Sequence, residues 1–280
     1  MHLGGPVDEV FDSPAAWIDA LETRGYTTAT APVGPDADPG TIDAYADSAG
    51  RAGITIAEVG AWEQNPIADD TDEREAAIDA CARHLELADR LGANCCVTVA
   101  GSRGDSWAAP HPENFSEETF DRIVASVRKI LDRAEPDTAS YALEPMPWIF
   151  PHDIESHHRL LEAVDRDAFA VHFDPVNMLS SPERVARNAD FVERFVDELG
   201  EEIACVHLKD VVLRDELTTH VDEVRPGTGT LDYHSLLSAL DTLDDDLPLL
   251  LEHLDDPDEY ELAADYVREV AADVGVALRG

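Results

Sequence analysis

The chain has few positive charges, and lysine is nearly missing. Its 280 residues carry 60 acidic against 20 basic side chains, a net charge of −40, and Lys129 and Lys209 are its only lysines. The charge argues against a nucleic-acid partner, because it repels phosphates. Acidic residues in every predicted helix favour a halophilic protein, since molar salt shortens the Debye length to about 3 Å. An acidic shell that only keeps the protein dispersed is the alternative.

Cysteine and long apolar runs are scarce as well. The four cysteines include Cys95 and Cys96, which point to opposite faces of a strand, and no C-x-x-C pair exists, so we expect reduced, packed thiols. No run approaches the ~18 apolar residues of a membrane span. The segment 1–5 has neither the basic nor the apolar part of a secretory signal. These absences predict a cytoplasmic protein without a membrane partner.

Strand and helix patterns alternate along the whole chain. Ser13-Pro14 predicts a helix start, and Gly25, Gly53 and Gly92 predict helix ends. Strands are predicted at 3–7, 26–32, 54–60, 94–101, 141–146, 169–175, 203–209 and 247–253, and the last four helices at 153–166, 181–199, 232–243 and 257–273. Eight strand–helix pairs without a linker predict a single α/β domain over residues 1–280, a (β/α)₈ TIM barrel, for which ~250 residues is typical.

Four potential metal ligands each end an apolar run in the second half of the chain. They are Glu144, Asp174, His207 and Glu252, separated by 30, 33 and 45 residues. A strand and its crossover helix need ~30 residues, so the four would lie at the carboxyl ends of successive strands, which meet in one pocket of a barrel. Three carboxylates and one imidazole need a cation there, and mixed oxygen and nitrogen ligation suits Mn²⁺, Mg²⁺ or Co²⁺ more than structural zinc. For any one residue alone, an ordinary polar strand end is the alternative.

The segments around these residues resemble the sugar phosphate isomerase/epimerase family. The similar segments are Glu-Pro-Met-Pro-Trp, Asp-Pro-Val-Asn, His-Leu-Lys-Asp, Pro-Gly-Thr-Gly and Leu-Glu-His. The resemblance implies a xylose isomerase-like TIM barrel, related to ketose 3-epimerases and endonuclease IV. It also implies one divalent metal ion, Mn²⁺ or Mg²⁺ with Co²⁺ or Zn²⁺ as alternatives, held by Glu144, Asp174, His207 and Glu252. Glu144 and Glu252 would also be the catalytic acid and base. A homodimer or homotetramer, both common in the family, is a further expectation.

The part of the site that would contact the sugar departs from the epimerase pattern. Asn177 stands where the epimerases carry a histidine, three residues after the metal-binding Asp. Leu213 stands where they carry a substrate-binding arginine, with Arg214 one step away. The resemblance therefore does not extend to 3-epimerisation, and Asn177 is kept as a candidate substrate contact.

Basic residues near the same strand ends are candidates for binding an anionic group. Lys209 lies two residues after His207, on the same face of the strand and nearer the pocket mouth, and is predicted to hold a substrate oxyanion or phosphate. Arg225, in the loop that follows, is a candidate for a carboxylate or phosphate. A salt bridge of Lys209 with Asp210 and a surface ion pair of Arg225 are the alternatives.

Other candidates would contact the sugar itself. Glu58 is predicted to bind hydroxyl groups, and Trp62 and Trp148 to stack on a sugar face, with a place in the core as the alternative for both tryptophans. The long loop 102–115 supplies Arg103 and His111 as candidate contacts if it closes over substrate, with a solvated histidine as the alternative. His172 is predicted to be a hydrogen-bonded histidine in the core.

Together these patterns predict a divalent-metal-dependent isomerase or epimerase of a sugar or sugar phosphate. Two glutamates would remove and return a proton next to a carbonyl, and the four ligands do not decide to which carbon or face it returns. The alternatives are a keto-polyol dehydratase of the inosose type, an apurinic endonuclease-like hydrolase, which the charge disfavours, and a barrel that binds a ligand without catalysis.

Overall fold

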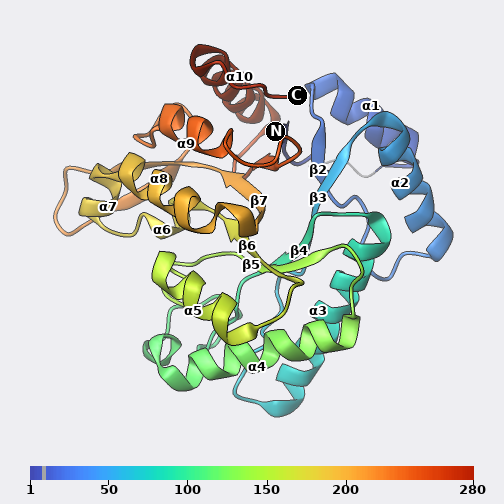
Figure 1. The fold of residues 1–280 in the computed structure, drawn as a ribbon, viewed down its shortest axis with the longest axis vertical. Coiled ribbons are helices and arrows are strands. Elements are labelled where there is room, and N and C mark those ends of the chain that lie inside the picture. Colours follow the sequence, from blue (N-terminus) through green and yellow to red (C-terminus); the bar gives the residue numbers. More distant parts are fainter. Residues whose placement is uncertain (8–10) are drawn as a thin grey trace.

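Eight parallel strands close into a barrel in the computed structural model, which describes residues 1–7 and 11–280 (Figure 1). The barrel strands are β1 (His2–Gly4), β2 (Thr28–Thr30), β3 (Thr55–Gly60), β4 (Cys95–Thr98), β5 (Ser140–Leu143), β6 (Phe169–Phe173), β7 (Ile203–Leu208) and β10 (Pro248–Leu251). Each strand pairs with the next along the chain, and β10 pairs with both β7 and β1 to close the ring. The predicted (β/α)₈ barrel is confirmed.

Helices surround the barrel and pack their apolar faces on the strands (Figure 1). The main ones are α1 (Pro14–Arg24), α2 (Pro39–Ala52), α3 (Thr71–Leu91), α4 (Glu117–Ala134), α5 (Ile154–Val164), α8 (Asn188–Leu199), α9 (Tyr233–Leu240) and α10 (Pro257–Val274). The predicted caps are present, since Ser13 accepts a hydrogen bond from the Ala16 amide and Gly25 ends α1 at φ 69°. No helix among the described residues is both long and apolar enough to cross a membrane.

The helix predicted at 181–199 is interrupted. The structure has α7 (Pro182–Ala186) and α8, separated by Arg187, whose φ of −121° and ψ of 34° are not helical. The Asn188 side chain donates to the carbonyls of Val185 and Thr230, which ties the break to a distant loop. Three short helices also went unpredicted, namely α6 (Pro175–Met178) and the 3₁₀ helices η1 (Pro112–Phe115) and η2 (Gly200–Glu202).

A β-hairpin follows β7 where the sequence predicted only a loop. It consists of β8 (Asp210–Leu213) and β9 (Val221–Val224), paired antiparallel with Asp210 opposite Val224. The hairpin leaves the barrel sheet and returns at Arg225, before α9. Elsewhere the strands are shorter than predicted, and the first is His2–Gly4 rather than 3–7.

The barrel interior holds small apolar side chains beneath the strand ends. Ala142, Cys205 and Leu250 belong to this inner cluster, and each lies two residues before a predicted metal ligand. Side chains two apart in a strand share a face, so Glu144, His207 and Glu252 also point inward, one layer higher. The intervening Leu143, Val206 and Leu251 belong to the larger core between strands and helices.

Candidate metal centre and substrate cavity

Glu144, Asp174, His207 and Glu252, which we call the upper group, converge at four neighbouring strand ends. They end or follow β5, β6, β7 and β10, which are adjacent in the barrel. Each residue offers one ligand atom, and these atoms all lie within 4.8 Å of one another. The structure therefore brings these four side chains together, as the sequence predicted.

The upper group has the features of a cation site. Asp174 Oδ2, His207 Nδ1 and Glu252 Oε2 are buried atoms that make no well-aligned hydrogen bond within the described residues. Their close neighbours are one another and the Lys209 ammonium. His207 Nδ1 lies 2.9 Å from Glu252 Oε2 and 3.5 Å from Glu144 Oε1. Buried carboxylates crowded in this way are costly without a compensating charge. Oxygen donors together with one imidazole suit a divalent metal ion, so these residues fit the metal that the sequence predicted.

Lys209 extends into the same carboxylates. Its Nζ lies 2.8 Å from Asp174 Oδ2 and 2.7 Å from Glu252 Oε2, and the residue is only 1% exposed. Burial lowers the pKa of the ammonium, but Asp174 and Glu252 outweigh this and raise the pKa well above its ordinary value. Lys209 is therefore an internal counter-ion beneath the cavity. Lys209 does not line the cavity.

The pKa shifts of the three carboxylates differ in direction. Burial raises the pKa of Asp174, and the nearby Glu144 and Glu252 charges add to this, so that the pKa lies above its ordinary value. Burial acts in the same direction on Glu144 and Glu252, but His207 and Lys209 hold the pKa of both glutamates below the ordinary range. The two glutamates are therefore ionised, which is the state that a general base requires.

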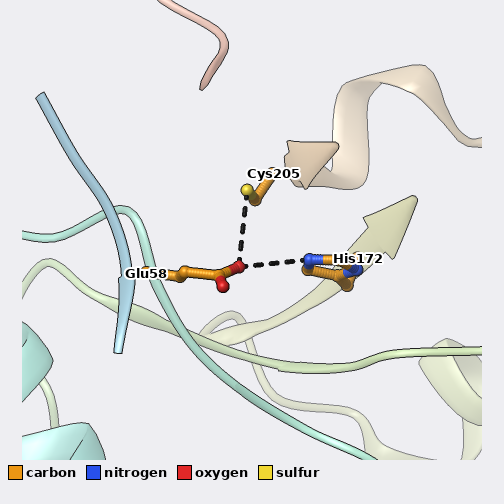
Figure 2. A group of neighbouring side chains, drawn as sticks. All are labelled: Glu58, His172 and Cys205. Carbon is orange, nitrogen blue, oxygen red and sulfur yellow. Dashed lines mark hydrogen bonds and ion pairs between the residues drawn. The ribbon is translucent and has the colours of Figure 1, made fainter. Parts of the chain in front are cut away.

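Glu58, His172 and Cys205 form a second group, which we call the lower group, one layer deeper in the barrel (Figure 2). Glu58 Oε2 accepts hydrogen bonds from His172 Nε2 at 3.3 Å, from the Cys205 thiol at 3.6 Å and from His207 Nε2 at 3.2 Å. Two irregularities in the sheet produce this meeting, because the β2–β3 pairing skips Ala57 and the β6–β7 pairing skips Ala204. Such bulges re-aim the side chains that follow them.

Hydrogen bonds account for the lower group without a metal. Burial raises the pKa of Glu58, but His207 and His172 outweigh this and lower the pKa to about 2. Burial raises the pKa of Cys205 well above its ordinary value, so the sulfur stays a thiol and a poor metal ligand. Because His207 donates to Glu58 through Nε2, its Nδ1 is left facing the upper group. A carboxylate that orients a metal-binding histidine in this way is a common arrangement.

A cavity of about 510 Å³ opens beside Glu144 and Glu252. Three of the four tryptophans, Trp62, Trp107 and Trp148, line it. The Trp148 indole donates to the Ala108 carbonyl at 2.9 Å, which joins the loop after β5 to the long loop 102–115. Trp62 and Trp148 were predicted to contact the sugar, whereas Trp107 was not. The position of Trp107 in the long loop was the only sequence signal for it.

The other predicted contacts fall in different places. Asn177 lines the cavity and donates from Nδ2 to Glu144 Oε1 at 3.0 Å. Arg103 pairs with Asp69 at 2.7 Å, His111 accepts the Glu113 amide at the start of η1, and Arg225 pairs with Glu259 at 2.7 Å. None of these three lines the cavity, and Glu58 lies buried beneath it.

Backbone strain also marks the cavity. Within the described residues, four non-glycine residues have positive φ, and two of them, Glu135 and Asp165, end helices. The other two, Glu63 at φ 63° and His253 at φ 58°, both line the cavity. Strained conformations of this kind gather at functional sites. His253 was not singled out from the sequence, and Glu223 raises its pKa by hydrogen bonding to its Nδ1.

A family model described as "Xylose isomerase-like TIM barrel" matches residues 18–270. The chain belongs to this family. No curated protein sequence matches the chain.

Solved structures of xylose isomerase-like barrels resemble the whole chain. D-psicose 3-epimerase from Clostridium cellulolyticum H10 is 15% identical with a TM-score of 0.71, covering 99% of this chain and 100% of that chain. Endonuclease IV from Thermus thermophilus is 16% identical with a TM-score of 0.73, covering 98% and 100%. A xylose isomerase-like TIM barrel protein from Mycobacterium smegmatis, in complex with magnesium, is 16% identical with a TM-score of 0.67, covering 95% and 91%. At these identities the likeness establishes the fold alone.

Proposed function

We propose that the protein is a divalent-metal-dependent isomerase or epimerase that acts on a sugar or a sugar derivative. The observation that carries the proposal is the upper group, in which three carboxylates and one imidazole bring their ligand atoms within 4.8 Å of one another beside a cavity. Mn²⁺ or Mg²⁺ suits this ligand set. When bound, the metal would polarise the substrate carbonyl and offset the negative charge that develops on it.

The chain's own residues supply the proton transfers. Glu144 and Glu252 come from β5 and β10, line the same cavity and are ionised, so either can remove a proton from a carbon next to a carbonyl. Return of the proton to the opposite face gives an epimer, and return to the neighbouring carbon exchanges aldose and ketose. Asn177 holds Glu144 Oε1 in place, and the indoles restrict access of water.

Proton exchange with solvent tests this proposal directly. The protein is incubated with Mn²⁺ in D₂O and a panel of ketoses, ketose phosphates and inososes, and deuterium at carbon is followed by NMR. We expect incorporation into at least one compound. The Glu252→Gln variant should lose it while keeping its fold, whereas Glu201→Gln, at an exposed position remote from the cavity, should retain it. Absence of exchange with every compound by the metal-loaded protein would refute the carbon-acid mechanism.

A further inference from the structure

The cavity walls are aromatic and acidic. Besides the three tryptophans, Glu63, Glu144 and Glu252 line it, while no arginine or lysine does so among the residues that the structure describes. His253 is the one lining side chain there with cationic character, and Glu223 lies 3.1 Å from its Nδ1. Away from the metal site, an anionic substrate group would therefore meet carboxylates without a free arginine or lysine to offset its charge.

The basic side chains predicted to contact the substrate are already paired with carboxylates of the chain. Lys209 Nζ contacts Asp174 and Glu252. Arg225 Nε lies 2.7 Å from Glu259, and Arg103 contacts both Asp69 and Glu118. A phosphate would have to displace a carboxylate from one of these pairs.

Three backbone amides in the loop after β9 that could bind an anion are occupied as well. In the loop after β9, the amides of Gly227 and Gly229 donate to Asp210 Oδ2 at 3.0 and 2.9 Å, and the Leu231 amide donates to Asp210 Oδ1 at 2.9 Å. A Cβ at Gly229 would lie 2.2 Å from Asp210 Oδ1, so the glycine allows this close approach. Successive amides that face one carboxylate form an anion nest, and here the chain's own Asp210 fills it.

Building on the proposed function, we propose that the substrate is an uncharged polyhydroxy carbonyl compound, which carries neither phosphate nor carboxylate and packs a C–H face against the tryptophans. Indole faces are electron-rich and favour contact with C–H groups, whereas phosphate recognition relies on free arginines, lysines or amides. Glu63 and Asn177 remain available at the cavity wall for hydroxyl groups. The cavity volume lies in the range of small-molecule sites.

Matched ligand pairs test the assignment. In the presence of Mg²⁺, tryptophan fluorescence is titrated with D-fructose, D-tagatose and D-psicose, and with the 6-phosphate of each. We expect a fluorescence change with the uncharged ketoses and binding at least about tenfold weaker for the phosphates. Trp107→Phe should reduce the change. Trp17→Phe should preserve it, because Trp17 is only 1% exposed and packs on Tyr45 in the core.

Each outcome decides the substrate class separately from the reaction. Equal or tighter binding of the phosphates would overturn the assignment, and so would the absence of any change with all of the uncharged ketoses. Binding of uncharged ketoses without deuterium exchange would refute the proposed reaction and leave the substrate class standing. Deuterium exchange confined to the phosphates would refute the substrate class and leave the proposed reaction standing.

Discussion

The upper and lower groups are built from similar side chains, one layer apart in the same barrel. Each includes a histidine and at least one acidic residue, and each is close enough in geometry to hold a metal. In the lower group, the Glu58 carboxylate already accepts three hydrogen bonds. In the upper group, Asp174 Oδ2 and Glu252 Oε2 make no such hydrogen bond within the described residues, and their close contacts are ion pairs with Lys209 and His207. Residue type alone thus does not separate a metal site from a structural cluster, whereas the hydrogen bonds of the carboxylate oxygens distinguish these two groups. The His172 Nδ1 atom of the lower group is also buried without a hydrogen-bond partner among the described residues.

The difference between the two groups is tested most directly by replacing one acidic residue of the upper group and the thiol of the lower group. Asp174→Asn should weaken Mn²⁺ binding on the order of 100-fold or more, because it removes a charged ligand. Cys205→Ser should leave the affinity within about twofold, since the sulfur is not a ligand. Isothermal titration calorimetry measures both. Equal losses in the two variants would mean that the metal binds across both layers.

Glu58 links the layers, so its replacement tests whether the lower group positions the upper one. Glu58→Gln should lower Mn²⁺ affinity by about 10- to 100-fold, the range found for carboxylates that orient a ligand histidine. The ¹⁵N shifts of the His207 ring should change, because a glutamine amide can donate to Nε2 and alter the tautomer. Cys205→Ser keeps the His207–Glu58 hydrogen bond and serves as the control. Unchanged affinity and unchanged ring shifts would refute the positioning role.

The two lysines allow a matched test of the internal counter-ion. Lys209→Met should lower the stability of the metal-free protein by about 3 kcal/mol, because it leaves buried carboxylates uncompensated. The rise in melting temperature on adding Mn²⁺ should therefore be larger than in the wild type. Lys129→Met, on a half-exposed pair with Glu75, should cost at most about 1 kcal/mol. Thermal unfolding with and without Mn²⁺ measures both, and equal effects would contradict the interpretation of Lys209.

A histidine outside both groups gives an effect that is confined to acidic pH. Burial lowers the pKa of His157 from 6.5 to about 4, so the folded protein keeps this ring neutral. Above pH 6.5 the His157 ring is neutral in the unfolded chain too, so it costs no stability there. As the pH falls towards 4, the ring takes up a proton only in the unfolded chain, and the folded protein loses stability. The loss is at most about 3.5 kcal/mol, at about 1.4 kcal/mol per pH unit. His157→Gln should flatten the slope of unfolding free energy between these pH values. An unchanged slope would show that His157 does not titrate as described.

The position of the upper group at the strand ends could be predicted largely from the sequence. Glu144, Asp174, His207 and Glu252 were predicted to meet because each ends an apolar run, and the crossover geometry of a barrel leaves one location for such ends. The helix ends at Gly25, Gly53 and Gly92 were equally local signals, and the structure has each glycine at positive φ. That the four upper-group residues bind a metal stays a prediction. The halophilic character, the cytoplasmic location and the homodimer or homotetramer stay predictions as well.

What the sequence missed depends on contacts between distant segments. The inward direction of Glu58 follows from the skipped Ala57, and its partners come from β6 and β7. Lys209 pairs with two carboxylates from other strands. The hairpin β8–β9 continues β7 almost without interruption, so its apolar residues could not be told from a longer strand and loop. Trp107 reaches the cavity only because the loop 102–115 bends back over β5.

Asp210 closes the base of the β8–β9 hairpin. Its carboxylate accepts hydrogen bonds from the amides of Gly227, Gly229 and Leu231, in the segment that follows β9. The tip, residues 214–220, lies beyond this closure and shares no hydrogen bond with the upper group. Insertions or deletions at the tip would therefore change the outer rim of the barrel without moving His207. The hydrogen bonds of Asp210 thus make the hairpin a region where new specificities could evolve while the chemistry of the strand ends is conserved.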